Sequence, residues 1–184
     1  MSTRGAYGFR LDGRDYIQYN HSDSYPSGLG ADILNQSKAL AKMPAVSLRN
    51  KVASIRLHDG KTPPTANDIA LLAPWTNLGV GQGSVSDWYC LTRNMQGDLL
   101  AHLKAGLIFD SRGFLKDSLF CEWAYIVNVD TRQLECYQGF NKSPNGAGRY
   151  ASLRDGDYYG VRLVRTYPLG RLPSLERFLK ELKD

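Results

Sequence analysis

The sequence predicts an α+β fold, in which a mainly antiparallel sheet built from hairpins packs with several helices in a single domain. Two observations support this prediction. Strand pairs joined by short turns occur near the start of the chain and again beyond residue 120, and stretches with apolar residues at helical spacing lie between and after them. Because hairpins outnumber strand–helix–strand crossovers, we expect antiparallel pairing to dominate.

The first strand pair is predicted over residues 5–11 and 14–20. Large apolar side chains alternate along GAYGFRL, which is the period of a half-buried strand. The intervening Asp12-Gly13 is a dipeptide typical of two-residue hairpin turns. The second strand runs into YNHSDSYPSGLG, residues 19–30, a corner that leads to a helix.

The middle of the chain is predicted to be mainly helical. Apolar residues recur at helical spacing in residues 31–42, 47–57, 66–73 and 94–106. Local signals mark their ends: Ser47 as an N-cap, Thr65 with Asp68 as a capping box, and Gly106 as a C-terminal stop. Between them, the glycine-rich residues 76–87 are predicted to form a mobile loop or lid, and residues 87–93 a short strand.

The last third of the chain returns to strands. CEWAYIVNVD and RQLECYQGF are predicted to form a hairpin, and the first strand of this hairpin is apolar on both faces, which indicates a central position in the sheet. Residues 158–167 are predicted to form a further strand. A closing helix is predicted over residues 173–184, with Ser174 as its N-cap. Since no linker, repeat or low-complexity tract interrupts the 184 residues, we expect residues 1–184 to form one globular domain.

Composition limits the classes of function. The net charge of +5 is mild, and its basic residues are mixed with acids, whereas nucleic-acid binders usually concentrate positive charge. No apolar run approaches the roughly 18 residues that span a bilayer, and the N-terminus lacks the apolar region of a secretory signal. Three widely spaced cysteines do not make a disulfide framework (Cys90, Cys121 and Cys136). We therefore expect a cytoplasmic protein without a membrane partner, and nucleic acid is disfavoured.

The metal and cofactor motifs are weak. The spacings typical of zinc sites are missing, and Gly28-Leu29-Gly30 is too short for a nucleotide fingerprint, so no metal and no cofactor is predicted. His102 lies beside Leu99 and Leu103 on a predicted helix, which indicates a half-buried side chain. His58, before Asp-Gly, is predicted to be a loop residue.

The corner at residues 19–30 is the strongest candidate site. His21, Asp23 and Ser24 are the residue types of a base, its orienting acid and a nucleophile. Functional triads are usually assembled from distant segments, so the alternative stays open that Asp23 caps a turn whose shape Tyr25-Pro26 fixes. As an enzyme, the protein would use His21 as general acid or base and Asp23 as its orienter.

The same corner would also contribute ligand contacts. Gly28 and Gly30 precede a predicted helix and could offer backbone N–H groups to an anion. Other predicted ligand-binding side chains lie within the corner or far from it in the chain: Asn20, Tyr25, Arg4, Glu122 and Arg162. A separate hypothesis places an N-terminal nucleophile at Ser2 or Thr3, just before the first strand.

Residues 3–30 resemble a family of small uncharacterised proteins of bacteriophages and bacteria. Its openings carry Thr-Arg, a glycine-containing strand, a turn, a second strand and an Asn/Cys-His-x-Asp-Ser/Gly-Tyr block, which here is Asn20 to Tyr25. Ser22 stands where relatives often have an aromatic residue, so a stacking role for that position is in doubt. The resemblance implies a phage or bacterial cytoplasmic setting and no particular reaction.

Three hypotheses about function follow. The first is an accessory protein that binds a small, nucleotide-like molecule or a host protein, because aromatic residues and scattered arginines suit such partners. The second is a hydrolase or transferase with its site at the His21–Asp23 loop. The third is weak nucleic-acid binding through the C-terminal arginines (Arg149, Arg154, Arg162, Arg165 and Arg171). Whether the protein is an enzyme stays open, and so does its oligomeric state.

Overall fold

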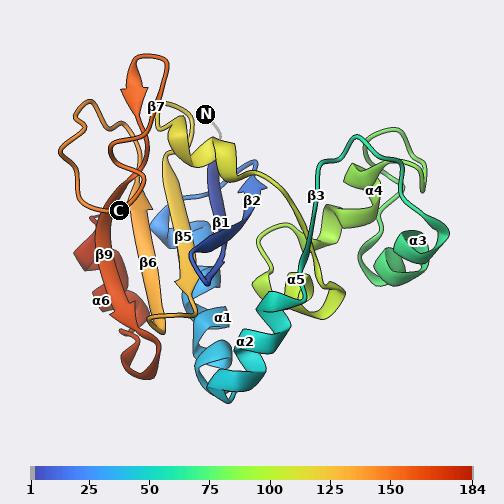
Figure 1. The fold of residues 1–184 in the computed structure, drawn as a ribbon, viewed down its shortest axis with the longest axis horizontal. Coiled ribbons are helices and arrows are strands. Elements are labelled where there is room, and N and C mark those ends of the chain that lie inside the picture. Colours follow the sequence, from blue (N-terminus) through green and yellow to red (C-terminus); the bar gives the residue numbers. More distant parts are fainter. Residues whose placement is uncertain (1–2, 184) are drawn as a thin grey trace.

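A five-stranded sheet organises the computed structural model, which describes residues 3–183. From one edge to the other, the strands are β2 (Arg14–Asn20), β1 (Gly5–Leu11), β5 (Trp123–Asn128), β6 (Gln133–Gln138) and β9 (Arg162–Pro168) (Figure 1). The β1–β5 pair is parallel and the other three pairs are antiparallel. The predicted α+β class with a mainly antiparallel sheet is confirmed.

Both predicted hairpins form, and one aspartate links their turns. Asp12 and Gly13 have φ angles of 51° and 73°, the left-handed conformation that two-residue turns require. The Asp130 carboxylate, in the turn of the second hairpin, accepts a hydrogen bond from the backbone N–H of Asp12 over 3.1 Å. The two turns therefore lie together at one end of the parallel β1–β5 pair.

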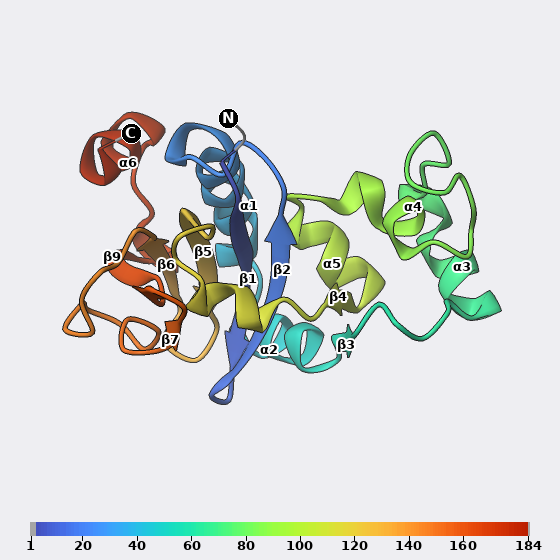
Figure 2. The same ribbon diagram turned by 90° about the horizontal axis from the view of Figure 1, so that it is seen from above.

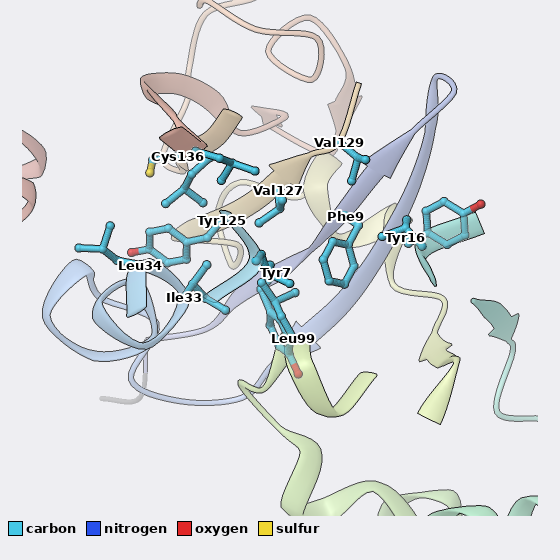
Figure 3. Close-up of a cluster of buried hydrophobic side chains, with 14 of the residues drawn as sticks. Tyr7, Phe9, Tyr16, Ile33, Leu34, Leu99, Tyr125, Val127, Val129 and Cys136 are labelled. Atoms are coloured by element: carbon cyan, nitrogen blue, oxygen red, sulfur yellow. The ribbon is translucent and has the colours of Figure 1, made fainter. Parts of the chain in front are cut away.

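The sheet is covered on both faces. On one face, helices α1 (Ala31–Ala41), α2 (Ala45–Ala53), α5 (Leu99–Ala105) and α6 (Leu175–Leu182) pack on the strands. Figure 3 shows Tyr125 of β5 beside Ile33 and Leu34 of α1, and Tyr7 of β1 turned toward Leu99 of α5. On the other face, the strands contact Leu115 of the short helix η4 (Arg112–Lys116) and the segment that holds Tyr150 and Val161. Every residue of β5 is buried, so its predicted central position is confirmed.

A helical lobe extends from the β2 edge of the sheet (Figures 1 and 2). It contains α3 (Ala66–Leu72), α4 (Trp88–Thr92) and the parallel strands β3 (Arg56–His58) and β4 (Leu107–Phe109). It contacts the sheet where β4 lies beside β2, and α5 packs into the core under the sheet. The lobe has its own buried cluster, which includes Leu72, Leu91 and Leu107. Its position beside β2 creates the groove described below.

Short elements complete the described chain. These are the helices η1 (Pro26–Gly30), η2 (Ala73–Trp75), η3 (Arg93–Met95) and η5 (Leu169–Arg171), and the hairpin of β7 (Arg154–Asp155) with β8 (Tyr158–Tyr159). Within residues 3–183, no helix has both the length and the apolar composition needed to cross a membrane.

Several predicted end signals are confirmed. Thr65 and Asp68 form a reciprocal capping box, and Ser174 accepts a hydrogen bond from the N–H of Arg177 at the start of α6. Gly106 ends α5 in the left-handed conformation with φ 63°. These signals act within one helical turn, which is why they can be identified from sequence.

One predicted element is wrong, and two others are confirmed only in part. The predicted strand at residues 87–93 is instead helix α4, over Trp88–Thr92, because the Asp87 side chain accepts a hydrogen bond from Tyr89 N and because Leu91 packs in the core of the lobe. The helix predicted at residues 47–57 starts at Ala45 and ends at Ala53, and its last predicted residues instead enter β3. The strand predicted at 158–167 is interrupted at Gly160, whose N–H donates to Leu153 O over 2.6 Å.

Candidate functional site

A groove runs between β2 and the lobe. Its central hollow has a volume of about 280 Å³ and lies between two walls. One wall is formed by the end of β2 and the next residue (Gln18, Tyr19 and His21), and the other by α4, η3 and the following turn (Tyr89, Thr92, Arg93 and Gln96). Two residues from distant segments form the floor, Tyr7 and His102.

Two further hollows adjoin the central one. The first, of about 490 Å³, shares Arg93 and Gln96 with it and reaches the corner after β2, where Asp23 and Asp32 contribute carboxylates. The second, of about 420 Å³, shares Tyr19 and Tyr89 and is mainly aromatic, with Trp88, Phe109 and Phe114. We call the three together the β2–α4 groove. One end is therefore polar and acidic, and the other is aromatic.

The floor is a buried, neutral tyrosine–histidine pair. The Tyr7 hydroxyl lies 2.9 Å from Nε2 of His102, and Nδ1 of His102 donates to the Leu107 carbonyl over 2.8 Å. Because that carbonyl can only accept, Nδ1 carries the proton and Nε2 accepts from Tyr7. Burial lowers the pKa of His102 to about 4 and raises that of Tyr7 well above its usual range. Both groups are thus uncharged near neutral pH.

Arg93 is the one arginine or lysine among the described residues that line the groove. Its guanidinium lies 5.9 Å from the centre of the Tyr89 ring and donates to Gln96 Oε1 over 2.6 Å. These contacts hold the positive charge between the acidic end and the aromatic end. An arginine in this position can donate parallel hydrogen bonds to a planar anion.

The corner after β2 is a turn held by internal hydrogen bonds. Ser24 is fully buried, and its hydroxyl accepts a hydrogen bond from Asn20 Nδ2 over 2.8 Å. Asp23 adopts a left-handed φ of 53°, and its carbonyl accepts from Leu29 N over 2.8 Å. The turn thus fixes Ser24 inside the protein, away from the residues that line the groove.

The structure places the predicted catalytic residues in different surroundings. His21 is exposed and lines the central hollow, with Nδ1 3.1 Å from the Tyr19 hydroxyl. Asp23 lines the adjoining acidic hollow. Ser24 is paired with Asn20, so the three side chains do not present one nucleophile–base–acid path into the groove.

The predicted ligand-binding residues are also distributed. Asn20 and Gly28 line the acidic hollow. Tyr25 is exposed and Gly30 is buried close to the Tyr125 ring, and neither is among the groove-lining residues. The structure therefore brings two of these four corner residues to the groove.

The three distant candidates lie elsewhere. The Arg4 guanidinium is 5.5 Å from the Phe120 ring centre, and the Arg4 carbonyl accepts from the N–H of Glu122 over 3.0 Å. Arg162 is on β9, at the opposite edge of the sheet from β2, and donates to Gln138. None of the three lines the β2–α4 groove as the structure describes it.

None of the remaining predicted candidates among the described residues lines the groove. Ser2 lies outside the described residues, and Thr3 is buried with no hydrogen-bond partner for its hydroxyl among them. Of the C-terminal arginines, Arg149 is paired with the buried Glu135 and Arg154 stacks on Tyr159. Within residues 3–183, no group of three or more histidine, cysteine or acidic side chains could hold a metal ion.

Several groove residues were not predicted from sequence. Tyr89 and Arg93 were assigned to a strand, and His102 was expected to be half-buried, whereas it is 2% exposed. His58, expected in a loop, is buried at the end of β3. The position of His102 on the apolar face of a helix predicts that its side chain is at least partly buried. It does not predict its partner, because Tyr7 is distant in sequence. No protein-family model matches this chain and no curated protein or solved structure matched it, so the family resemblance of residues 3–30 stays a prediction.

Proposed function

We propose that the β2–α4 groove binds a small nucleotide-like ligand, meaning a molecule with a planar ring, polar hydroxyls and an anionic group. The observation that carries this proposal is the position of Arg93, the one arginine or lysine among the described residues that line the groove, between an aromatic hollow and an acidic one. Small-molecule sites typically combine apolar walls with a few well-placed polar groups.

The aromatic end suits a planar ring. Tyr19 lies edge-on to Phe114, with ring centres 5.0 Å apart, and Tyr89 faces them from α4. Aromatic side chains stack on any base, because every base has a π face. A ring bound here would leave its substituents directed along the groove toward Arg93.

The centre and the acidic end suit the rest of such a ligand. The Arg93 guanidinium would pair with a phosphate or carboxylate. The Asp23 and Asp32 carboxylates line the adjoining hollow and would accept hydrogen bonds from ribose-type hydroxyls. An anion larger than one phosphate would meet these carboxylates, so the groove favours a single anionic group.

Isothermal titration calorimetry with AMP, adenosine and inorganic phosphate tests the proposal. AMP should bind more tightly than either fragment. Arg93→Gln should weaken AMP binding by about tenfold or more, since a charge-assisted hydrogen bond contributes roughly 1.5–3 kcal/mol. Tyr89→Ala should weaken both AMP and adenosine by about tenfold.

Arg154→Gln is the matched control. Arg154 also stacks on a tyrosine, with its guanidinium 5.4 Å from the Tyr159 ring centre, but it belongs to the β7–β8 hairpin. This variant should bind AMP as the wild type does. AMP binding that is absent, or that is reduced equally by Arg93→Gln and Arg154→Gln, would exclude the groove as a nucleotide site.

A hydrolase or transferase reaction is the second candidate, favoured by the presence of His21 and Asp23 in adjoining hollows of the same groove. In this function His21 would transfer a proton to or from the bound ligand. Ser24 would take no part, because its hydroxyl is buried against Asn20. If AMP is turned over, His21→Ala should abolish turnover while Ser24→Ala should not.

A further inference from the structure

His58 packs against two aromatic rings beside the groove, stacked on Trp88 and edge-on to Phe109, and we call these three rings the His58 stack. Its imidazole is 4.2 Å from the Trp88 ring, with an angle of 29° between the planes, and 5.0 Å from Phe109, at 82°. The residue is 7% exposed, and neither ring nitrogen has a hydrogen-bond partner among the described residues. The ring is thus held by packing alone, in a hollow where each nitrogen is shielded from solvent.

The stack connects the groove wall to the lobe's small sheet. Trp88 is the first residue of α4, and it lines the aromatic hollow together with Phe109 of β4. The Trp88 indole N–H donates to the Thr62 carbonyl over 2.8 Å, which ties the same ring to the 59–65 loop. A change at His58 therefore acts directly on the position of α4, which carries Tyr89 and Thr92 of the groove.

The charges near His58 do not provide a partner for a protonated ring. Arg56 of β3 has the same sign, and Asp68 of α3 is already bound to Arg56 and to Thr65. Asp59 accepts hydrogen bonds from the backbone N–H groups of Lys61 and Thr62, and His102 of α5 is itself buried. Burial, with a smaller effect of Arg56, lowers the pKa of His58 to about 4, and the opposing attraction of the Asp68 and Asp59 carboxylates is too small to prevent this.

We propose that His58 is a positioning residue whose neutral ring holds α4 against β3 and β4, and that acidification releases this wall and weakens ligand binding in the groove. The part concerning the ligand rests on the proposed function. Protonation would place two unpaired N–H donors and a charge between two aromatic rings. The attraction of a cation to the indole face offsets only part of that cost, because the donors stay unpaired while the stack is closed.

NMR spectroscopy of the protein alone tests the conformational part. On titration from about pH 7.5 to about pH 4.5, the Trp88 indole N–H and the amides of Tyr89 and Thr92 should shift or broaden together. His58→Phe keeps a stacked ring that cannot be protonated, and His58→Gln keeps a polar, uncharged side chain. Neither variant should show this transition, while amides of β6 should behave alike in all three proteins.

AMP affinity measured at about pH 7.5 and at about pH 4.5 tests whether the change at His58 weakens ligand binding. The affinity of the wild type for AMP should fall about fivefold or more on acidification, as expected for coupling between two sites. The affinity of His58→Phe for AMP should fall much less. A transition of α4 that is the same in His58→Phe, or no transition in the wild type, would overturn the proposal. If AMP does not bind at all, the proposed function fails, while the titration of the protein alone still decides the role of His58.

Discussion

The hydroxyl of Tyr7 and Nε2 of His102 lie 2.9 Å apart, although 95 residues separate them in the chain. Gly97 N donates to the same hydroxyl over 2.8 Å. One phenol thus connects β1, the turn before α5, and α5 itself. Since this contact forms the floor of the groove, the relative position of sheet and lobe depends on it.

Tyr7→Phe is expected to lower the free energy of unfolding by about 1–3 kcal/mol, because it leaves His102 Nε2 and Gly97 N buried without a partner. Urea denaturation measures this change. Tyr25→Phe removes a hydroxyl from an exposed tyrosine and should have little effect. Equal stabilities of Tyr7→Phe and the wild type would mean that water replaces the lost contacts.

Stability should also fall on mild acidification. The pKa values of His58 and His102 are both lowered from 6.5 to about 4, in each case mainly by burial. Between these values the unfolded chain binds more protons than the folded one, so the stabilisation is complete above about pH 6.5 and is lost as the pH falls toward 4. At about pH 5, each histidine should lower the free energy of unfolding by roughly 2 kcal/mol relative to neutral pH.

Urea denaturation at about pH 7.5 and about pH 5 measures this dependence. His58→Phe should remove about half of it. The carboxylates with lowered pKa values, such as Asp68 and Asp87, lose their contribution only below about pH 4, outside this window. Identical pH dependence in wild type and His58→Phe would assign the loss to other groups.

The sequence predicted the elements that depend on neighbouring residues. The Asp12-Gly13 turn, the Thr65–Asp68 capping box and the closing helix after Ser174 are all determined by interactions within a few positions. The parallel pairing of β1 with β5 was not predicted. It joins segments more than 100 residues apart, and no local pattern specifies it.

The candidate site was predicted only in part for the same reason. The corner at residues 19–30 does border the groove, but the opposite wall depends on α4. Aromatic and β-branched residues in DWYCLTR favour a strand, whereas burial of Cys90 and Leu91 in the lobe stabilises a helix. The ligand-binding role proposed for Arg93 depends on the position of this helix beside β2, which the sequence did not predict.

Gly28→Ala tests whether the close packing of the turn after β2 contributes to stability. A Cβ at Gly28 would overlap the carbonyl oxygen of Asp23, a backbone atom that the Leu29 N–H also contacts. The substitution should therefore lower the free energy of unfolding by about 1–3 kcal/mol. Thermal or urea denaturation measures the loss. Gly113→Ala is the control, because a Cβ there has no neighbour within 4 Å, and the two variants should differ clearly.

The buried ion pair on the other face of the sheet gives a further prediction. Glu135 is 5% exposed and accepts hydrogen bonds from both terminal nitrogens of Arg149, from Asn128 over 2.8 Å and from Tyr137 over 2.9 Å. Glu135→Gln removes the closer negative charge and leaves the Arg149 guanidinium with Asp15, 3.9 Å from its Nε, as the remaining carboxylate partner. Loss of one partner of a buried pair typically costs about 3 kcal/mol.

Urea denaturation of Glu135→Gln should show this loss, with the groove unchanged. Asp12→Asn is the matched control, since Asp12 pairs with Arg49 on the surface, where water screens the charges and asparagine tolerates the left-handed turn. Its stability should stay close to that of the wild type. If both variants lose the same small amount of stability, Asp15 and solvent suffice to balance the Arg149 charge, and the pair with Glu135 contributes to the position of the 141–161 segment rather than to stability.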